Sequence, residues 1–191
     1  YFYVSNFDIF LLAVKPSDIE ALCKTQLTKE FFDMDKQPFI ISIAAGVTTR
    51  SLDEYLGDYG AGKLIRAMPN LCAKKGFAMT GLYGEPYYFK SGTSSEGKLI
   101  SEIFKSIGKV LWVDKESDLD SVTAISGSGP AYVYFIMNAM IETAEELGIK
   151  KSVAQKLVAQ TIVGAGETGK NIVNLKNEII KVSSKGGTTE K

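Results

Sequence analysis

The chain has 191 residues, of which 45% are hydrophobic and 23% charged, and its 22 Lys and Arg residues balance 22 Asp and Glu residues. This composition is typical of a globular protein and excludes an extensively disordered chain. The formal net charge of zero argues against a protein that binds nucleic-acid backbones, because such proteins usually carry a basic surface.

Histidine is absent from the sequence. The chain therefore has no Ser-His-Asp or Cys-His catalytic arrangement and no metal site with imidazole ligands. Cys23 and Cys72 form no CxxC pair, so we expect two reduced, packed cysteines and no bound metal. Acid–base chemistry then depends on carboxylates, Lys, Tyr, Thr or a cofactor.

Residues 1–117 alternate between strand-like and helix-like patterns. We expect strands at residues 7–14, 38–45, 63–68, 76–83 and 109–114. We expect a helix after Pro16 with Ser17 or Asp18 as its N-cap, a short helix that begins with the capping-box spacing of Ser51 and Glu54, and an amphipathic helix within 96–108.

Fully apolar strands that alternate with helices predict a doubly wound, mostly parallel α/β sheet covered on both faces. Ligands of such sheets bind at the carboxyl ends of the strands. The segments 14–16, 45–47 and 68–70 are therefore the expected place for chemistry.

Strand patterns nearly vanish from about Asp118, so we predict a domain boundary at 117/118 and an all-α second domain. We expect one helix from Pro130 to a Schellman stop at Gly148, a second from the capping-box spacing of Ser152 and Gln155, and a third over 175–182. The helices are apolar on more than one side. Burial in a symmetric dimer explains this better than an inter-domain core, which remains the alternative.

Two glycine-containing stretches could bind a ligand. In SSKGGTT, residues 183–189, adjacent glycines can form a backbone nest for a carboxylate or phosphate, although a mobile tail has the same composition. In TAISGSGPAY, residues 123–132, the glycines allow close approach of a helix or a flat ring, and a plain helix start is the alternative. The second stretch is not a nucleophile elbow, since GxSxG is not matched.

Six segments, in order, resemble pyrroline-5-carboxylate reductase: FLLAVKP, IISIAAGVT, IRAMPN, VTAISGSGPAYVYF, VAQTIVGAG and VSSKGGTT. The resemblance implies an incomplete Rossmann-like domain at 1–117 that binds NADP or NAD, followed by a helical dimerisation and substrate domain at 118–191. It also implies a cytoplasmic homodimer, or a larger assembly of dimers, that reduces 1-pyrroline-5-carboxylate to L-proline. No nucleic acid or membrane partner is expected.

The resemblance also assigns site residues. Ala13, Val14, Lys15 and Ala45 are expected to line the nicotinamide-ribose end of the cofactor, and Ser184, Gly187 and Thr189 to hold the imino-acid substrate. Thr189 matches the family threonine beside the ring nitrogen, where it could help to orient or protonate that atom, so the resemblance makes it the expected catalytic residue. A protonated cyclic imine is already an electrophile and the cofactor supplies the hydride, so alignment is the protein's main task and no strong base is needed.

The sequence departs from the family in three ways. The glycine-rich βαβ and the final helices are not in it, so we expect this chain alone to bind dinucleotide weakly, and Lys185 stands where the family usually has proline. The alternatives are a non-catalytic dimerisation fragment and a related NAD(P)-dependent reductase with another substrate.

Overall fold

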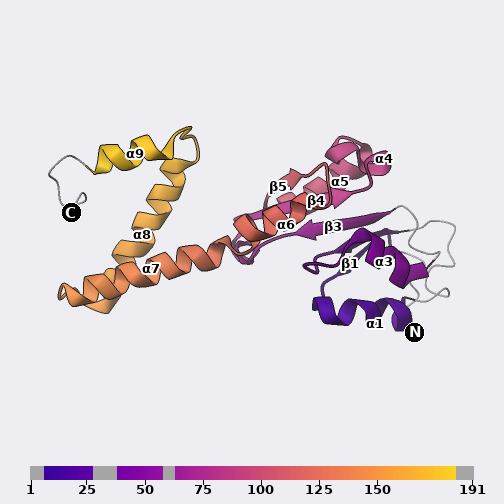
Figure 1. Cartoon of the computed structure of the whole chain (residues 1–191), viewed down its shortest axis with the longest axis horizontal. Coiled ribbons are helices and arrows are strands. Elements are labelled where there is room, and N and C mark those ends of the chain that lie inside the picture. Colours follow the sequence, from indigo (N-terminus) through magenta and orange to yellow (C-terminus); the bar gives the residue numbers. More distant parts are fainter. Residues whose placement is uncertain (1–6, 28–37, 58–62, 184–191) are drawn as a thin grey trace. The chain divides into compact units, whose positions relative to one another are not determined.

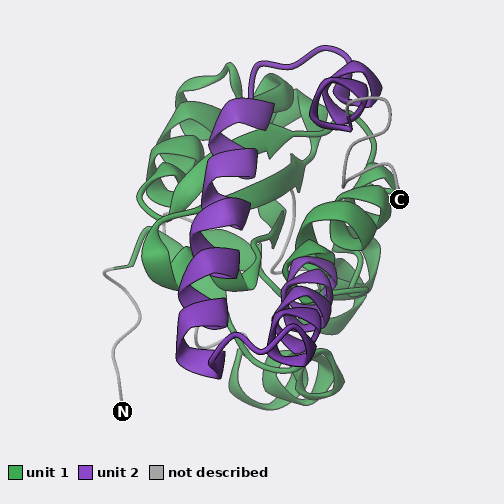
Figure 2. Ribbon diagram, turned by 90° about the vertical axis from the view of Figure 1, so that its left-hand side faces the viewer, with its two compact units in different colours: residues 1–131 green, residues 132–191 purple. Residues whose placement is uncertain are grey.

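The computed structural model describes residues 7–27, 38–57 and 63–183 (Figure 1). The chain forms two compact units that divide between Ala131 and Tyr132, and Figure 2 colours them green and purple. Residues 118–131 are helical, as their composition indicates, but they pack with the sheet of the first unit. The boundary between the two compact units therefore lies further along the chain than position 117/118, where the composition changes.

The first unit contains a five-stranded sheet whose strands lie in sequence order. Its strands are β1 (Ile9–Leu12), β2 (Phe39–Ser42), β3 (Leu64–Met68), β4 (Ala78–Gly84) and β5 (Gly108–Trp112). The pairs β1–β2, β2–β3 and β4–β5 are parallel, whereas β3–β4 is antiparallel. The predicted mostly parallel sheet is thereby confirmed.

Eight α-helices surround or follow the sheet in the described residues. They are α1 (Pro16–Gln26), α3 (Thr49–Leu56), α4 (Pro86–Phe89), α5 (Ser95–Lys105), α6 (Asp118–Val122), α7 (Gly129–Glu146), α8 (Lys151–Gly169) and α9 (Leu175–Val182). Short 3-10 helices cover Leu71–Lys75 (η3) and Lys90–Gly92 (η4), and a π-helix covers Thr123–Gly127 (η5).

Each face of the sheet has its own hydrophobic core, because successive strand residues point to opposite faces. Ile40 packs with Ile19 of α1 and Leu52 of α3. Its neighbour Ile41 packs on the other face with Phe89 of α4 and Ile100 of α5. The central strands are thus largely covered on both sides, whereas Leu11 of β1, Met79 of β4 and Leu111 of β5 stay exposed.

Three predicted helix starts are wrong, all by a few residues. The N-cap of α1 is Lys15 rather than Ser17 or Asp18, because Pro16 takes the first helical position, where its missing amide loses no hydrogen bond, and the Asp18 amide donates to the Lys15 carbonyl. The N-cap of α3 is Thr48 rather than Ser51, and its side chain accepts a hydrogen bond from the Ser51 amide. Helix α8 begins at Lys151 after Lys150, so Ser152 lies inside it.

The second unit contains the predicted Schellman stop. Gly148 has φ = 84°, its amide donates to the Glu145 carbonyl, and the Ile149 amide donates to the Ala144 carbonyl. In the part of this unit that the structure describes, only Ala154 and Val158 are buried. No helix within the described ranges combines the length and apolarity needed to cross a bilayer.

The caps give a stability prediction. Thr48→Ala should lower the free energy of unfolding by about 1 kcal/mol, because the Ser51 amide loses its acceptor. Ser17→Ala is the matched control and should change it by less than about 0.5 kcal/mol, since the Ser17 hydroxyl only bonds the exposed Asp18 carboxylate. Urea denaturation of both variants measures the difference. Equal losses would contradict the assignment of the caps.

Candidate functional site

The loops after β1 and β2 lie side by side at one edge of the sheet. The strands are parallel neighbours, and the Ile43 amide donates to the Leu12 carbonyl at 3.1 Å just beyond their last residues. Ala13, Val14, Lys15 and Ala45 are all exposed there. The structure thus brings together the four residues predicted to contact the cofactor.

Backbone geometry keeps this edge open. Gly46 has φ = 77°, a left-handed conformation that a side chain would strain, and a Cβ on it would meet no atom within 4 Å. The Lys15 carbonyl accepts from the Asp18 amide and so closes the first turn of α1 directly after this loop. The small side chains of Ala13 and Ala45 leave room for a flat group above the two loops.

The end of β3 contributes Asn70, which reaches across to the glycine-rich stretch. The Asn70 Nδ2 donates to the Ser126 carbonyl at 3.0 Å and to its Oγ at 3.1 Å. The Ser126 hydroxyl in turn lies 3.2 Å from the Met79 carbonyl at the start of β4. We call the Asn70–Ser126 pair the Asn70 latch.

The glycine-rich stretch forms the π-helix η5, with a Ser128 amide that donates to the Thr123 carbonyl at 2.8 Å. A Cβ on Gly127 would lie 2.9 Å from the Met68 side chain, so glycine permits the close approach of this turn to β3. Single π-helical turns occur frequently at functional sites. The stretch is therefore more than a plain helix start, because side-chain bonds fix it to the sheet.

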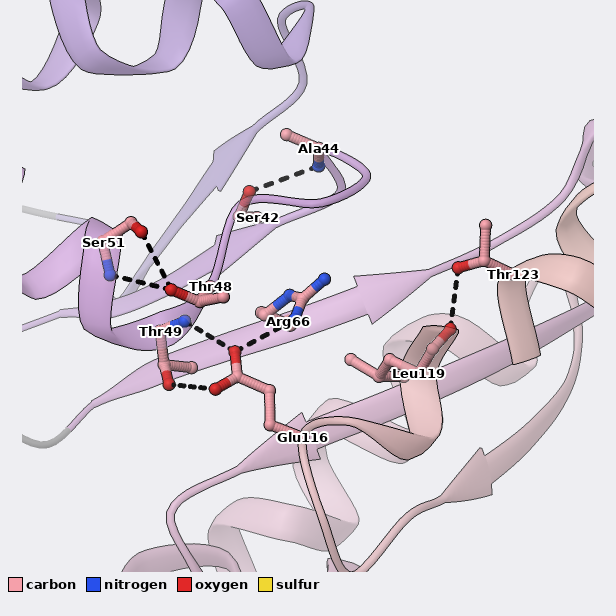
Figure 3. A network of polar contacts seen from close by, with 9 residues as sticks. All are labelled: Ser42, Ala44, Thr48, Thr49, Ser51, Arg66, Glu116, Leu119 and Thr123. Atoms are coloured by element: carbon pink, nitrogen blue, oxygen red, sulfur yellow. Dashed lines mark hydrogen bonds and ion pairs between the residues drawn. The ribbon is translucent and has the colours of Figure 1, made fainter. Parts of the chain in front are cut away.

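A buried ion pair lies on the α3 face of the sheet (Figure 3). The side chain of Arg66, on β3, is 8% exposed, and its Nη1 lies 3.0 Å from Oε1 of Glu116. The same carboxylate accepts from the Thr49 amide at 2.6 Å and from the Thr49 hydroxyl at 3.0 Å. Glu116 thus joins β3, the start of α3 and the segment that leads into α6. We call this arrangement the Glu116 clamp.

Tyr83 pairs with Arg66 across β3 and β4. Burial raises the pKa of the Tyr83 phenol, and the negative charges of Glu85 and Glu116 raise it further. The phenol therefore stays neutral beside the clamp at physiological pH. It adds no charge to the Arg66–Glu116 pair.

The second unit has an open apolar groove of about 460 Å³ along one face of α7. Its lining residues are Phe135, Ile136, Ala139, Met140, Thr143, Ala144 and Leu147. Phe135 and Leu147 are each 77% exposed. An apolar helix face of this kind favours contact with another protein surface.

The predicted substrate residues Ser184, Gly187 and Thr189, and Lys185 among them, lie outside the described residues. Their assignment stays a prediction. Within the ranges that the structure does describe, His, Cys, Asp and Glu side chains form no group of three that could hold a metal ion.

Sequence reasoning missed both the Glu116 clamp and the partner of Asn70. Arg66 in the otherwise apolar run KLIRAM was an available signal, because a buried guanidinium needs an anionic partner. Asn70 was within a segment expected to carry chemistry, but nothing in the sequence indicated that Ser126 would be its partner.

The chain is similar to known proteins in sequence and in structure. Residues 116–191 match the family described as pyrroline-5-carboxylate reductase dimerisation. Pyrroline-5-carboxylate reductase of Pseudomonas aeruginosa is 34% identical over 98% of this chain, which covers 65% of that protein. The chain thus spans just under two thirds of the length of this relative.

Two solved structures are similar over the same extent. A pyrroline-5-carboxylate reductase from Coxiella burnetii is 34% identical with a TM-score of 0.80, over 98% of this chain and 66% of that one. Plasmodium falciparum pyrroline carboxylate reductase, solved with NADP bound, is 29% identical with a TM-score of 0.84, over 98% of this chain and 67% of that one. The chain is thus similar to pyrroline-5-carboxylate reductases in sequence over nearly its whole length and in structure.

Proposed function

We propose that this chain is part of an NAD(P)H-dependent oxidoreductase that reduces 1-pyrroline-5-carboxylate to L-proline, the last step of proline biosynthesis, in the cytoplasm. The observation that carries the proposal is the similarity of nearly the whole chain to pyrroline-5-carboxylate reductases, together with the six matching segments. The strand-end residues of these segments, Ala13, Val14, Lys15 and Ala45, lie together. Residues 1–117 would form the cofactor domain and 118–191 the dimerisation and substrate domain.

The residues at the ends of β1 and β2 fit a dinucleotide. They offer exposed backbone, two small alanine side chains and one lysine beside parallel strand ends, where such ligands bind. Ala13, Val14, Lys15 and Ala45 would hold its nicotinamide-ribose end. The cofactor, NADP or NAD, supplies the hydride when it is bound.

The substrate residues would act by orientation. Ser184 and Gly187 would hold the carboxylate of the imino acid by hydroxyl and backbone donors. Thr189 would hydrogen-bond at the ring nitrogen, with its hydroxyl oxygen accepting from the N–H of the protonated imine, and so fix the C=N bond relative to the cofactor site. Fixing two reactants in this way can contribute about 7–11 kcal/mol to a barrier, and it requires no histidine.

The partner would be a second copy of the chain, in a homodimer or an assembly of dimers. The apolar groove on α7 supports this arrangement. So does the small number of buried residues, two in the described part of the second unit, because obligate interfaces resemble a core cut in half. The match of residues 116–191 to a dimerisation family supports it further.

The direct test uses the protein expressed from its complete gene. It should oxidise NADPH or NADH, followed at the nicotinamide absorbance, only when 1-pyrroline-5-carboxylate is added. A boiled sample and a reaction without imino acid are the controls. The absence of turnover with both dinucleotides would refute the proposed activity.

Thr189→Ala tests the substrate residues. Loss of the hydroxyl at the ring nitrogen should lower kcat by about 100-fold. Thr168→Ala is the control, since the Thr168 hydroxyl bonds only carbonyls of its own helix. Sedimentation should give the same assembly for both variants. A change of assembly in Thr189→Ala would make the loop structural rather than catalytic.

Ile136→Lys tests the interface, because it places a charge in the α7 groove. A charge buried in an apolar contact is costly, so the dimer should dissociate, with the Kd raised at least about 100-fold in sedimentation. Leu99→Lys makes the same change at an exposed apolar residue of α5 in the first unit and should leave the dimer intact. Equal behaviour of the two variants would place the groove outside the interface.

A further inference from the structure

We propose that Glu116 is a positioning residue that couples the cofactor loop after β2 to the segment leading into the helical unit. This inference rests on the proposed function for its kinetic consequence. The structural part, that one carboxylate holds the two segments together, does not depend on it.

The first observation is the number of segments that meet at one carboxylate. Glu116 Oε1 accepts from the Thr49 amide and from Arg66, and Oε2 accepts from the Thr49 hydroxyl. Thr49 lies 67 positions before Glu116 in the chain and Arg66 lies 50 before it. These bonds therefore fix tertiary structure rather than a local turn.

The second observation is what Thr49 carries. It is the first residue of α3, and the loop of residues 43–48 immediately before it contains Ala45, one of the proposed cofactor contacts. A bond to the Thr49 amide at 2.6 Å fixes the end of that loop. The carboxylate also lies at the N-terminus of α3, where a negative charge is favourable.

The third observation is what Glu116 precedes. Residues 118–127 form α6 and η5, and they lead directly into α7. Helix α6 packs closely on β4, since a Cβ on Gly81 would lie 2.8 Å from Val122 and 3.0 Å from Leu119. The Asn70 latch holds the far end of this segment, so the segment is fixed at both ends.

The burial of Arg66 makes the coupling stiff. Its guanidinium is almost excluded from solvent, and an unpaired buried charge is strongly unfavourable. Glu116 therefore cannot leave Arg66 without a large penalty. If the segment before α6 shifts, Glu116 therefore keeps its bonds, and Arg66 and Thr49 move with it. Water does not replace these bonds.

The decisive variant replaces both charges, Arg66→Met with Glu116→Met. Apolar side chains of similar volume often replace a buried ion pair without loss of stability, whereas Glu116→Ala alone would leave Arg66 unpaired and could prevent folding. The double variant retains the packing but removes the acceptor of the Thr49 amide and hydroxyl. Glu54→Gln, in an exposed ion pair with Arg50 on the same helix, is the control.

The first measurement is amide hydrogen exchange by mass spectrometry. In the double variant, exchange should rise in peptides that cover residues 43–50 and 116–122, at a melting temperature close to that of the wild type. Peptides of α5 report on global loosening and should not change. Wild-type exchange in both segments of the double variant would overturn the proposal, whether or not the protein is a reductase.

The second measurement is kinetic. Misplacement of the cofactor loop should lower kcat by about tenfold or more, with the KM for the imino acid within about twofold of wild type. Glu54→Gln should retain wild-type constants. Increased exchange with unchanged kcat would overturn the positioning role. A wild-type protein without reductase activity would refute the proposed function instead, while the exchange experiment would still test the coupling.

Discussion

A positive charge buried in the middle of the sheet is the constraint on which the first unit depends. Arg66 lies on β3 between Ser42 of β2 and Tyr83 of β4, on the face of the sheet that also carries the core around Ile40. Its only way to remain there is with a carboxylate close by. The chain supplies Glu116 after β5, and this brings the segment before α6 over the sheet (Figure 3). This ion pair thus fixes the segment before α6 to the sheet.

The strands could be predicted from the sequence because each is a short apolar run whose two faces are buried. The starts of α1, α3 and α8 could not, because a cap is defined by backbone conformation rather than by residue type alone, whereas the helix predicted over 175–182 matches α9. Ser51 and Ser152 have the residue types and spacing of a capping box, yet each lies inside a helix that starts two or one residues earlier. The helix end at Gly148 was predicted correctly, because a left-handed residue followed by an apolar one is a more specific signal for a helix end.

The edge of the sheet that we propose for the cofactor was also predictable, since parallel strand order places Ala13 and Ala45 at one edge once the strands are known. The pairings of Arg66 with Glu116 and of Asn70 with Ser126 were not. Each joins residues at least 50 positions apart, and a single sequence carries no information about which polar groups meet in three dimensions. The expected substrate residues came from the family resemblance. The local pattern alone allowed two interpretations of residues 183–189, a ligand-binding loop or a mobile tail.

The antiparallel pairing of β3 and β4 divides the loops of the first unit between two edges of the sheet. The loops after β1, β2 and β3 share one edge, whereas the segment 85–94 follows β4 at the other. That segment contains the exposed rings of Tyr87 and Tyr88, with centroids 5.1 Å apart, and the left-handed residues Lys90 and Ser91. Phe89 of the same segment is buried in the core, so the segment is anchored while its tyrosines face outward. A substitution at the exposed Tyr87 therefore changes one rim of the sheet without touching the residues of the opposite rim.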